Sequence, residues 1–327
     1  MQFGLLSAGF VSLALASRAP SAPDDCKSLG TVGFVCLTAT AEDMVAIPGS
    51  DWIVVSGVLR AVNVKDRREI PLYSSDPALD HARYPACPGP LDGRELADRK
   101  VYAHGINLRP GPDGRHTLYV VHHSGRESVE IFLIDVRGET PTVTWVGCAL
   151  SPAGVSGNSV AVLPNGGFAL TNFLSKSLGA WSGDKGATVR TMFARGEVTG
   201  EVWEWNVGRG WSKVPGSEGA GPNGLEASPD DFHPDNLRWQ RDGSLLVAGQ
   251  RGTVEAVLND CLTRNDCSGI ATSVAAVDPA TLEARELVHA YPSNASFAAG
   301  TTGLRIGNEI WVGSTWHGTR IARFPVK

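Results

Sequence analysis

Four short segments of this chain place carboxylate or amide side chains beside glycine, proline or other turn-forming residues. They read AEDM, SGNSVAVLPNGG, GPNGLEASPD and HPDNLRWQRDG, and their oxygen-bearing side chains include Glu42, Asp43, Asn158, Asn223, Asp235 and Asn236. Calcium takes six to eight oxygen ligands, both anionic and neutral. The segments are scattered over the chain, so they form one calcium site only if the fold brings equivalent turns to a common axis.

The chemistry of such a site would be acyl transfer. A cation held by the two carboxylates of Glu42 and Asp235, together with neutral amide oxygens, can polarise a carbonyl group and stabilise an oxyanion. His104, in a His-Gly-Ile segment, would take a proton from the attacking water, and a second histidine could fix its tautomer. The chain has no G-x-S-x-G nucleophile elbow, which argues against a serine-dependent esterase.

The bulk composition is that of one large β-rich domain. The chain has 327 residues, of which 42% are hydrophobic, with 38 glycines and 20 prolines. An all-β fold of this length can be a single domain. The formal net charge is −5 and no run of five basic residues occurs, so we expect no nucleic-acid partner.

The N-terminus and the cysteines indicate a secreted or periplasmic protein. The apolar stretch 3–16 is too short to span a membrane, and the small residues that follow it predict a signal peptide over residues 1–19. We expect an N-terminal segment at 20–35 and no membrane span. Cys261 and Cys267 flank a short polar loop and are predicted to bridge. The remaining four, Cys26, Cys36, Cys87 and Cys148, leave three pairings open.

Short β-rich runs recur along the whole chain and alternate with turn residues. A PDG, PNG or RDG turn precedes a strand in GPDGRHTLYVV, LPNGGFALTNF and QRDGSLLVAGQ, and such a turn is typical of a hairpin corner. Only the segment around 186–198 shows helical periodicity. Repetition at roughly 40–60 residues predicts a β-propeller. A β-sandwich is the alternative, but it rarely reaches this length.

The ordered motifs resemble those of the paraoxonase/arylesterase group of calcium-dependent six-bladed β-propellers, which is related to the gluconolactonase-like (SMP-30) proteins. The segments that carry the resemblance are AEDMVAIPGSDWIVVSG, YAHGINL, LYVVHHSGRESVEIF, GNSVAVLPNGGFALTNF, GPNGLEASPD, DNLRWQRDGSLLVAG and AAGTTGLRIGNEIWVGSTWHGTRIARF. The resemblance implies an all-β, six-bladed propeller over residues 36–327.

The resemblance also implies a site and an activity. A catalytic Ca²⁺ would be held by Glu42, Asn158, Asn223, Asp235 and Asn236. A second, structural Ca²⁺ would lie near Asp43 and the carbonyl group of Ile106. His104 and His123 would form a histidine dyad. The implied reaction is hydrolysis of small-molecule lactones or aryl esters.

The chain departs from the family pattern at three places. Ser159 stands where the family has an aspartate for the structural calcium, and a hydroxyl is a poorer calcium ligand than a carboxylate. His122 and His123 both follow the same strand, and we favour His123 because the family uses the second of the pair. Only twelve residues separate Asn223 from Asn236, which predicts an incomplete blade. Its exposed strand edge would allow a homodimer.

Two other functions fit the same sequence. A propeller with a purely structural calcium could be a binding or scaffold protein. The fold also supports isomerases and strictosidine-synthase-like enzymes, since fold does not determine function. An acidic base other than histidine would then be needed, and Glu226 is the candidate that the sequence offers.

Overall fold

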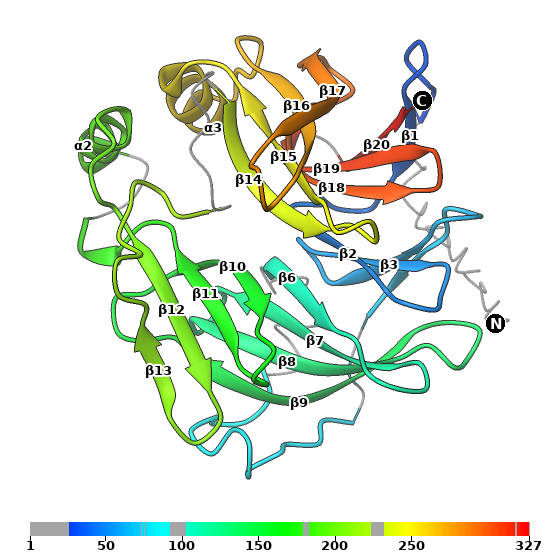
Figure 1. Ribbon diagram of the computed structural model, residues 1–327, viewed down its shortest axis with the longest axis vertical. Coiled ribbons are helices and arrows are strands. Elements are labelled where there is room, and N and C mark those ends of the chain that lie inside the picture. The colour runs from blue at the N-terminus through cyan, green and yellow to red at the C-terminus, as the bar shows by residue number, and fades with distance from the viewer. Residues whose placement is uncertain are drawn as a thin grey trace, which may run out of the picture.

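The computed structural model describes residues 26–72, 74, 76–91, 103–178, 183–223, 232–317 and 319–326, with the backbone alone at 183–187, 232–234 and 315–317. The predicted signal peptide lies outside these residues. Most of the regular secondary structure in the described chain is β-strand, and the strands form a β-propeller (Figure 1). The predicted all-β class and propeller architecture are therefore confirmed.

The described residues form five sheets of four strands each. The first sheet contains β2 (Met44–Ala46), β3 (Trp52–Val55), β4 (Arg60–Asn63) and β5 (Glu69–Pro71). The second contains β6 (Ala103–Arg109), β7 (Arg115–His122), β8 (Ser128–Asp135) and β9 (Thr142–Leu150). The third contains β10 (Gly157–Val162), β11 (Phe168–Asn172), β12 (Glu201–Asn206) and β13 (Gly210–Lys213).

The fourth sheet contains β14 (Phe232–Trp239), β15 (Leu245–Arg251), β16 (Ala271–Val277) and β17 (Ala284–Pro292). The fifth contains β18 (Ala298–Ile306), β19 (Glu309–His317), β20 (Arg320–Pro325) and the N-terminal strand β1 (Gly33–Cys36). Strand β1 pairs with β20 in antiparallel register. The first strand of the chain therefore completes the last blade and closes the ring.

The predicted number of six blades is wrong, because the part of the chain that the structure describes forms five. The short interval between Asn223 and Asn236 leads from the third sheet to the fourth, so a whole blade is missing there rather than part of one. Propellers close with various numbers of blades, and each of the five described sheets has all four strands. The incomplete blade on which the predicted dimer rested is thus absent from the described sheets.

The predicted turns connect the inner two strands of three blades. The PDG turn joins β6 to β7, the PNG turn joins β10 to β11, and the RDG turn joins β14 to β15. Each turn contains a glycine with positive φ, namely Gly114 at 69°, Gly166 at 89° and Gly243 at 82°. Glycine adopts this conformation without steric cost, so these hairpins are encoded locally.

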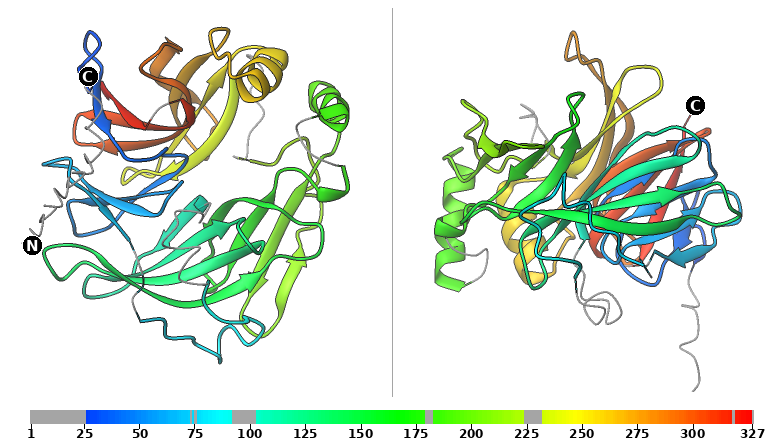
Figure 2. Two further views of the ribbon diagram at one scale, coloured as in Figure 1. Left: turned by 180° about the vertical axis from the view of Figure 1, so that it is seen from behind. Right: turned by 90° about the horizontal axis from the view of Figure 1, so that it is seen from below.

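Two longer connections carry the helices. The β11–β12 connection contains η1 (Lys176–Leu178) and α2 (Gly183–Ala194), which overlaps the predicted helical segment. The β15–β16 connection contains η2 (Glu255–Cys261) and α3 (Leu262–Arg264). Both connections project from the same side of the propeller (Figure 2). Phe193 of α2 packs against the apolar cluster around η2, so the two connections support each other. None of the described helices is long and apolar enough to cross a membrane.

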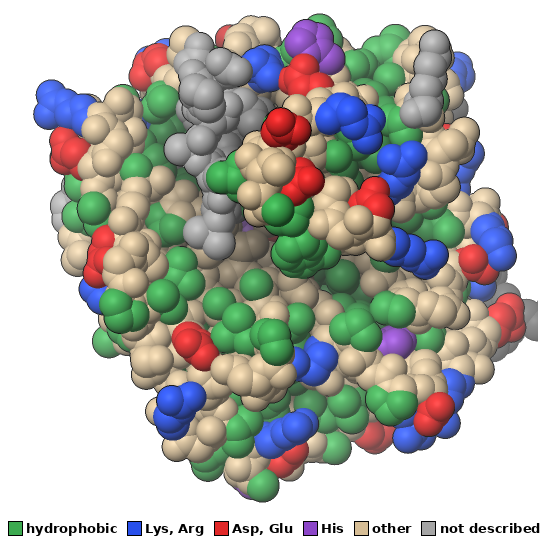
Figure 3. Space-filling model, in the orientation of Figure 1, with side chains coloured by type: hydrophobic (Ala, Val, Ile, Leu, Met, Phe, Trp, Pro, Cys, Tyr) green, Lys and Arg blue, Asp and Glu red, His purple; other side chains and the backbone are tan. Residues whose placement is uncertain are grey.

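The described residues contain three disulfides, two of which join a loop to a blade strand and one of which lies within the β15–β16 connection. Cys261 is bonded to Cys267 as predicted, and the structure resolves the open pairings as Cys26–Cys36 and Cys87–Cys148. On the face shown in Figure 3, charged side chains of both signs are scattered around the rim, and hydrophobic side chains gather toward the hollowed centre.

Candidate functional site

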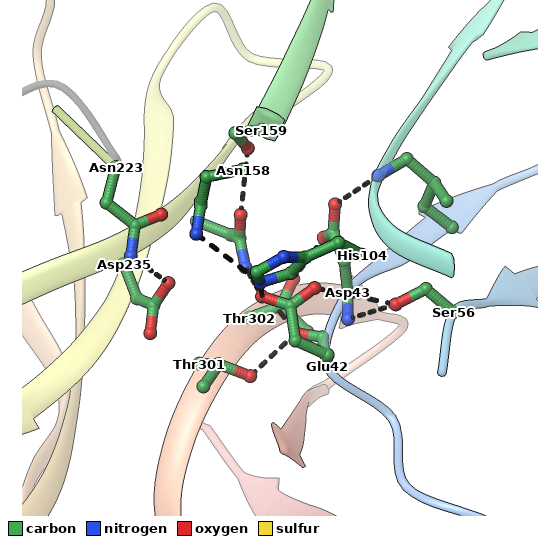
Figure 4. Close-up of polar contacts among 12 residues, drawn as sticks. Glu42, Asp43, Ser56, His104, Asn158, Ser159, Asn223, Asp235, Thr301 and Thr302 are labelled. Carbon is green, nitrogen blue, oxygen red and sulfur yellow. Dashed lines mark hydrogen bonds and ion pairs between the residues drawn. The ribbon is translucent and has the colours of Figure 1, made fainter. Parts of the chain in front are cut away.

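The first strands of the five sheets lie around the central axis. Strand β6 contacts β2 and β10, and β18 contacts β2 and β14. Most of the predicted site residues sit on these strands or just before them, whereas Asn223 lies between β13 and β14 and His123 directly follows β7. Figure 4 shows the side chains from the different blades converging. Glu42 and Asp43 precede β2, His104 lies on β6, Asn158 on β10, and Asp235 and Asn236 on β14.

On three of the inner strands, the pairing with the next strand is irregular at the site residues. The register shifts between Ala103 and Ile106 in β6, between Gly157 and Val160 in β10, and between Pro234 and Leu237 in β14. Successive side chains of a regular strand point to opposite faces, whereas a β-bulge re-aims them. The bulge in β14 explains how the neighbouring residues Asp235 and Asn236 both contact groups at the axis.

Gly105 allows β6 and β10 to approach closely at this point. A Cβ atom at Gly105 would lie 2.4 Å from the Asn158 carbonyl oxygen and 2.7 Å from Ser159 Cα. Both are backbone atoms, so neither can turn aside as a flexible side chain would. The glycine of the His-Gly-Ile segment therefore holds His104 beside Asn158, whose Nδ2 is 3.3 Å from His104 Nε2.

We expect Gly105→Ala to lower the free energy of unfolding by about 1–3 kcal/mol, because overpacking forces the backbone to shift. Thermal or urea unfolding measures the change. Gly219→Ala is the matched control, since a Cβ there meets nothing within 4 Å. Equal stability of the two variants would show that the β6–β10 contact is not tight.

Two buried carboxylates lie at the centre of the site. Glu42 is 5% exposed and Asp235 is 8% exposed. Burial, followed by the charges of Asp43 and Asp235, raises the pKa of Glu42 well above its usual range. Burial raises the pKa of Asp235 to about 7, against the hydrogen bonds from Gln250 and Asn223. The environment therefore disfavours the ionised forms of Glu42 and Asp235, and a bound cation would stabilise both.

Two amide oxygens beside these carboxylates have no hydrogen-bond donor. Asn158 Oδ1 and Asn223 Oδ1 are buried and unpaired, although Asn223 Nδ2 donates to Asp235 Oδ1 at 2.9 Å. Buried polar atoms without partners are rare. Among the described residues no three His, Cys, Asp or Glu side chains gather as a metal site, so a cation here would depend on amide oxygens. Carboxylate and amide oxygens suit a hard cation such as Ca²⁺.

Asn236 joins the two sides of the site. Its Nδ2 donates to Glu42 Oε1 at 3.1 Å, and its Oδ1 accepts from Ser159 Oγ at 3.0 Å. The two ends of an amide have nearly the same shape, and the Ser159 hydroxyl can donate or accept. Half a turn of the Asn236 amide would therefore present its oxygen toward Glu42 and keep the contact with Ser159.

The histidines form a chain that ends in a carboxylate. His104 Nδ1 lies 3.0 Å from His123 Nε2, and His123 Nδ1 lies 2.8 Å from Glu127 Oε2. His122 contacts the carbonyl group of Ser124 instead. The geometry therefore pairs His104 with His123 rather than with His122, and His123 is the residue that the resemblance favours.

Glu127 was not among the predicted site residues. Burial would raise the pKa of Glu127, but the hydrogen bond from His123 and the ion pair with Lys176 together lower it. Because Glu127 is ionised, it accepts a hydrogen bond from His123 Nδ1–H. His123 Nε2 is then unprotonated and accepts a hydrogen bond from His104 Nδ1–H. His104 Nε2 therefore carries a lone pair, which accepts a hydrogen bond from Asn158 Nδ2. Burial, followed by the His123 charge, lowers the pKa of His104 to about 3, so it is neutral across the physiological range.

Asp43 and the Ile106 carbonyl group lie close together, as the prediction of a second calcium requires. The Ile106 amide donates to Asp43 Oδ2 at 2.8 Å. The guanidinium of Arg238 contacts both Asp43 Oδ1 and the Ile106 carbonyl oxygen. Arg238 and Gln250 are further residues that the sequence did not single out, and no local motif marks either one. Glu226, the alternative acidic base, lies outside the described residues.

No protein-family model matches the chain, and a search of curated proteins finds no match. Solved structures that are similar to it include a protein from Thermus thermophilus provisionally assigned as an oxidoreductase (glucose dehydrogenase), at 12% identity and a TM-score of 0.41 over 89% of this chain and 98% of that one. Another is a protein provisionally assigned as a gluconolactonase, at 12% identity and a TM-score of 0.43 over 90% and 92%.

A third similar structure is an endo-arabinase from Bacteroides thetaiotaomicron, at 11% identity and a TM-score of 0.41 over 90% of this chain and 98% of that one. These three proteins have different activities, and likenesses of this strength carry no argument about function. A functional assignment therefore has to come from the site itself.

Proposed function

We propose that this protein is a calcium-dependent hydrolase that opens lactones or cleaves aryl esters. One observation carries the proposal. Two buried carboxylates, two unpaired amide oxygens and a neutral histidine meet at one place on the propeller axis. That set combines ligands for a hard cation with a proton acceptor, and both are needed to hydrolyse an activated ester.

The ion would be held by side chains from four segments of the chain: Glu42, Asn158, Asn223, Asp235 and Asn236. When bound, Ca²⁺ supplies a Lewis acid that polarises the substrate carbonyl group. Its positive charge would also favour the ionised forms of Glu42 and Asp235, whose pKa values burial raises. Gln250 Nε2 donates to Asp235 Oδ2 at 3.1 Å and to the Gly300 carbonyl oxygen at 2.8 Å, which fixes the orientation of Asp235.

His104 would act as the general base through Nε2. A water molecule loses a proton to Nε2 as its oxygen bonds to the carbonyl carbon. The C–O bond to the leaving group then breaks, and the same proton passes to the leaving alkoxide or phenoxide. The positive charge that forms on His104 would be stabilised by Glu127, whose charge favours the protonated form of His104.

A non-catalytic binding protein with a structural calcium is the second candidate. One observation favours it. The pKa of His104 is lowered to about 3, so His104 is a weak base at neutral pH. A catalytic base works best when its pKa is near the operating pH. In that case the same ion would hold the blades together without turnover.

Hydrolysis assays with metal-stripped protein separate the two functions. Phenyl acetate and small lactones serve as substrates, each with and without added Ca²⁺. A hydrolase should show activity that requires Ca²⁺ and is lost in Asn223→Ala. Ca²⁺ binding with no turnover on any of these substrates would favour the binding protein, and activity that is indifferent to chelation would contradict the proposed role of the ion.

The contribution of Asp235 to the stability of the metal-free protein should fall as the pH rises from about 4 to about 7. An unfolded aspartate loses its proton near pH ~4, whereas Asp235 keeps it to about 7 when buried. Between these values Asp235 holds its proton only in the folded state, so its contribution falls by up to about 1.4 kcal/mol per pH unit. Glu42 acts in the same direction, whereas His104, whose pKa burial lowers to about 3, acts in the opposite direction.

Thermal melts of metal-stripped protein across this pH range measure the effect. Added Ca²⁺ should stabilise most at and above about pH 7, because the ligands must be deprotonated. Asp235→Asn removes this contribution, so the stability of the native protein relative to Asp235→Asn should fall as the pH rises across the range. If that difference does not change with pH, the assignment of Asp235 as a buried carboxyl with a raised pKa is wrong.

A further inference from the structure

Arg238 carries a positive charge into the centre of the propeller. It lies on β14 and its side chain is 9% exposed. Its Nε donates to the Met44 carbonyl oxygen at 2.8 Å, and its Nη1 donates to the Leu237 carbonyl oxygen at 2.7 Å. Its Nη2 donates to Asp43 Oδ1 and, at 2.8 Å, to the Ile106 carbonyl oxygen. The guanidinium thus binds backbone or side-chain oxygens from the first, second and fourth blades.

Asp43 is fully buried, so its carboxylate is contacted by protein groups and not by bulk water. Besides Arg238, its Oδ1 accepts from Thr302 Oγ1 at 3.0 Å and from the Met44 amide at 2.8 Å. Its Oδ2 accepts from the Ile106 amide at 2.8 Å. A buried carboxylate without a countercharge is strongly destabilising. Some cation is therefore required at this position.

We propose that Arg238 is that cation and takes the place of a structural metal ion. Arg238 Nη2 contacts both oxygens that a second calcium would use, Asp43 Oδ1 and the Ile106 carbonyl oxygen. A metal ion and the guanidinium nitrogen cannot both occupy the space between these two oxygens. The charges of this pair also balance, because one guanidinium faces one carboxylate.

Ser159 fits the same substitution. It stands where the family that the sequence resembles has an aspartate, and its hydroxyl is hydrogen-bonded to Asn236 Oδ1 at 3.0 Å. Because Ser159 is neutral, it adds no charge to the ion pair of Arg238 and Asp43. The ion pair between Arg238 and Asp43 thus joins the blades at the axis without a structural metal ion. Removing the Arg238 side chain should leave a divalent-cation site at Asp43.

Calcium stoichiometry tests the inference, measured by calorimetry on metal-stripped protein. Arg238→Ser should bind one Ca²⁺ more than the native chain, whatever number the native chain binds. That difference separates this inference from the proposed function, because failure of the catalytic site would change both proteins equally. Arg238→Ser should also melt at a lower temperature without Ca²⁺ and recover with it.

A paired variant covers the case in which Arg238→Ser does not fold. Asp43→Asn combined with Arg238→Met removes both charges, and replacing a buried ion pair by neutral groups is often tolerated. It should bind as many ions as the native chain and be more stable than Asp43→Asn alone. Arg238→Lys keeps the charge and should add no ion. An equal ion count for native protein and Arg238→Ser, or one ion fewer in the paired variant, would overturn the inference.

Discussion

Replacing His104 with glutamine should lower the rate of ester or lactone hydrolysis roughly 10²–10⁴-fold, the usual contribution of a general base. His104 Nε2 lies 3.5 Å from Glu42 Oε1 and 3.3 Å from Asn158 Nδ2, so the lone pair is next to the proposed ion. Glutamine keeps a polar side chain but has no basic nitrogen. Steady-state kinetics on phenyl acetate and a small lactone measure the loss.

The controls separate catalysis from metal binding. Because His104 is not a proposed ligand, His104→Gln should keep the Ca²⁺-dependent rise in melting temperature. His123→Gln and Glu127→Gln should cost less, since these residues act through His104. His289→Gln, at an exposed side chain, should change nothing. Near-native turnover in His104→Gln would mean that the metal alone activates water, and the histidine chain would then be structural.

Asp235→Asn should abolish the stabilisation of the protein by Ca²⁺ together with its activity. The substitution keeps the shape of the side chain and removes one of the two negative charges that hold the ion. A ligand present at about a hundred times its Kd stabilises the folded state by about 2.7 kcal/mol, and we expect most of that gain to disappear. Thermal melts with excess Ca²⁺ and with EGTA measure it.

The metal-free variant gives an independent readout. Without Ca²⁺, Asp235→Asn should melt at or above the native temperature at neutral pH, because a neutral amide is less costly to bury than a carboxylate. Asp242→Asn is the matched control, since Asp242 is exposed in the RDG turn and bonds only locally to Ser244. If Asp235→Asn and the native protein respond equally to Ca²⁺, the ion does not bind at this site.

Much of the fold could be predicted because its signals are local. The PDG, PNG and RDG turns need glycine at positive φ, and each one forms the hairpin that was expected. The bridge between Cys261 and Cys267 spans six positions, so near neighbours determine it. The other two disulfides depend on how the loops pack, and sequence could not choose among their pairings.

The number of blades could not be predicted. A short interval before Asp235 is compatible with a damaged blade or with a missing one, and only the strand pairing distinguishes them. The structure shows five complete sheets in the described residues, with the N-terminal strand β1 closing the ring. Ring closure is a property of all blades together, so no local segment encodes it.

The residue types of the candidate site were determined by the sequence alone, including the adjacent pair Asp235 and Asn236. The tertiary structure decided which groups meet there. The bulge in β14 lets both of these side chains contact the axis, and Arg238 reaches Asp43 across 195 positions of the chain. Turns and strands follow from interactions between neighbours in sequence, whereas the neutralisation of a buried charge depends on which groups the fold brings within a few ångströms.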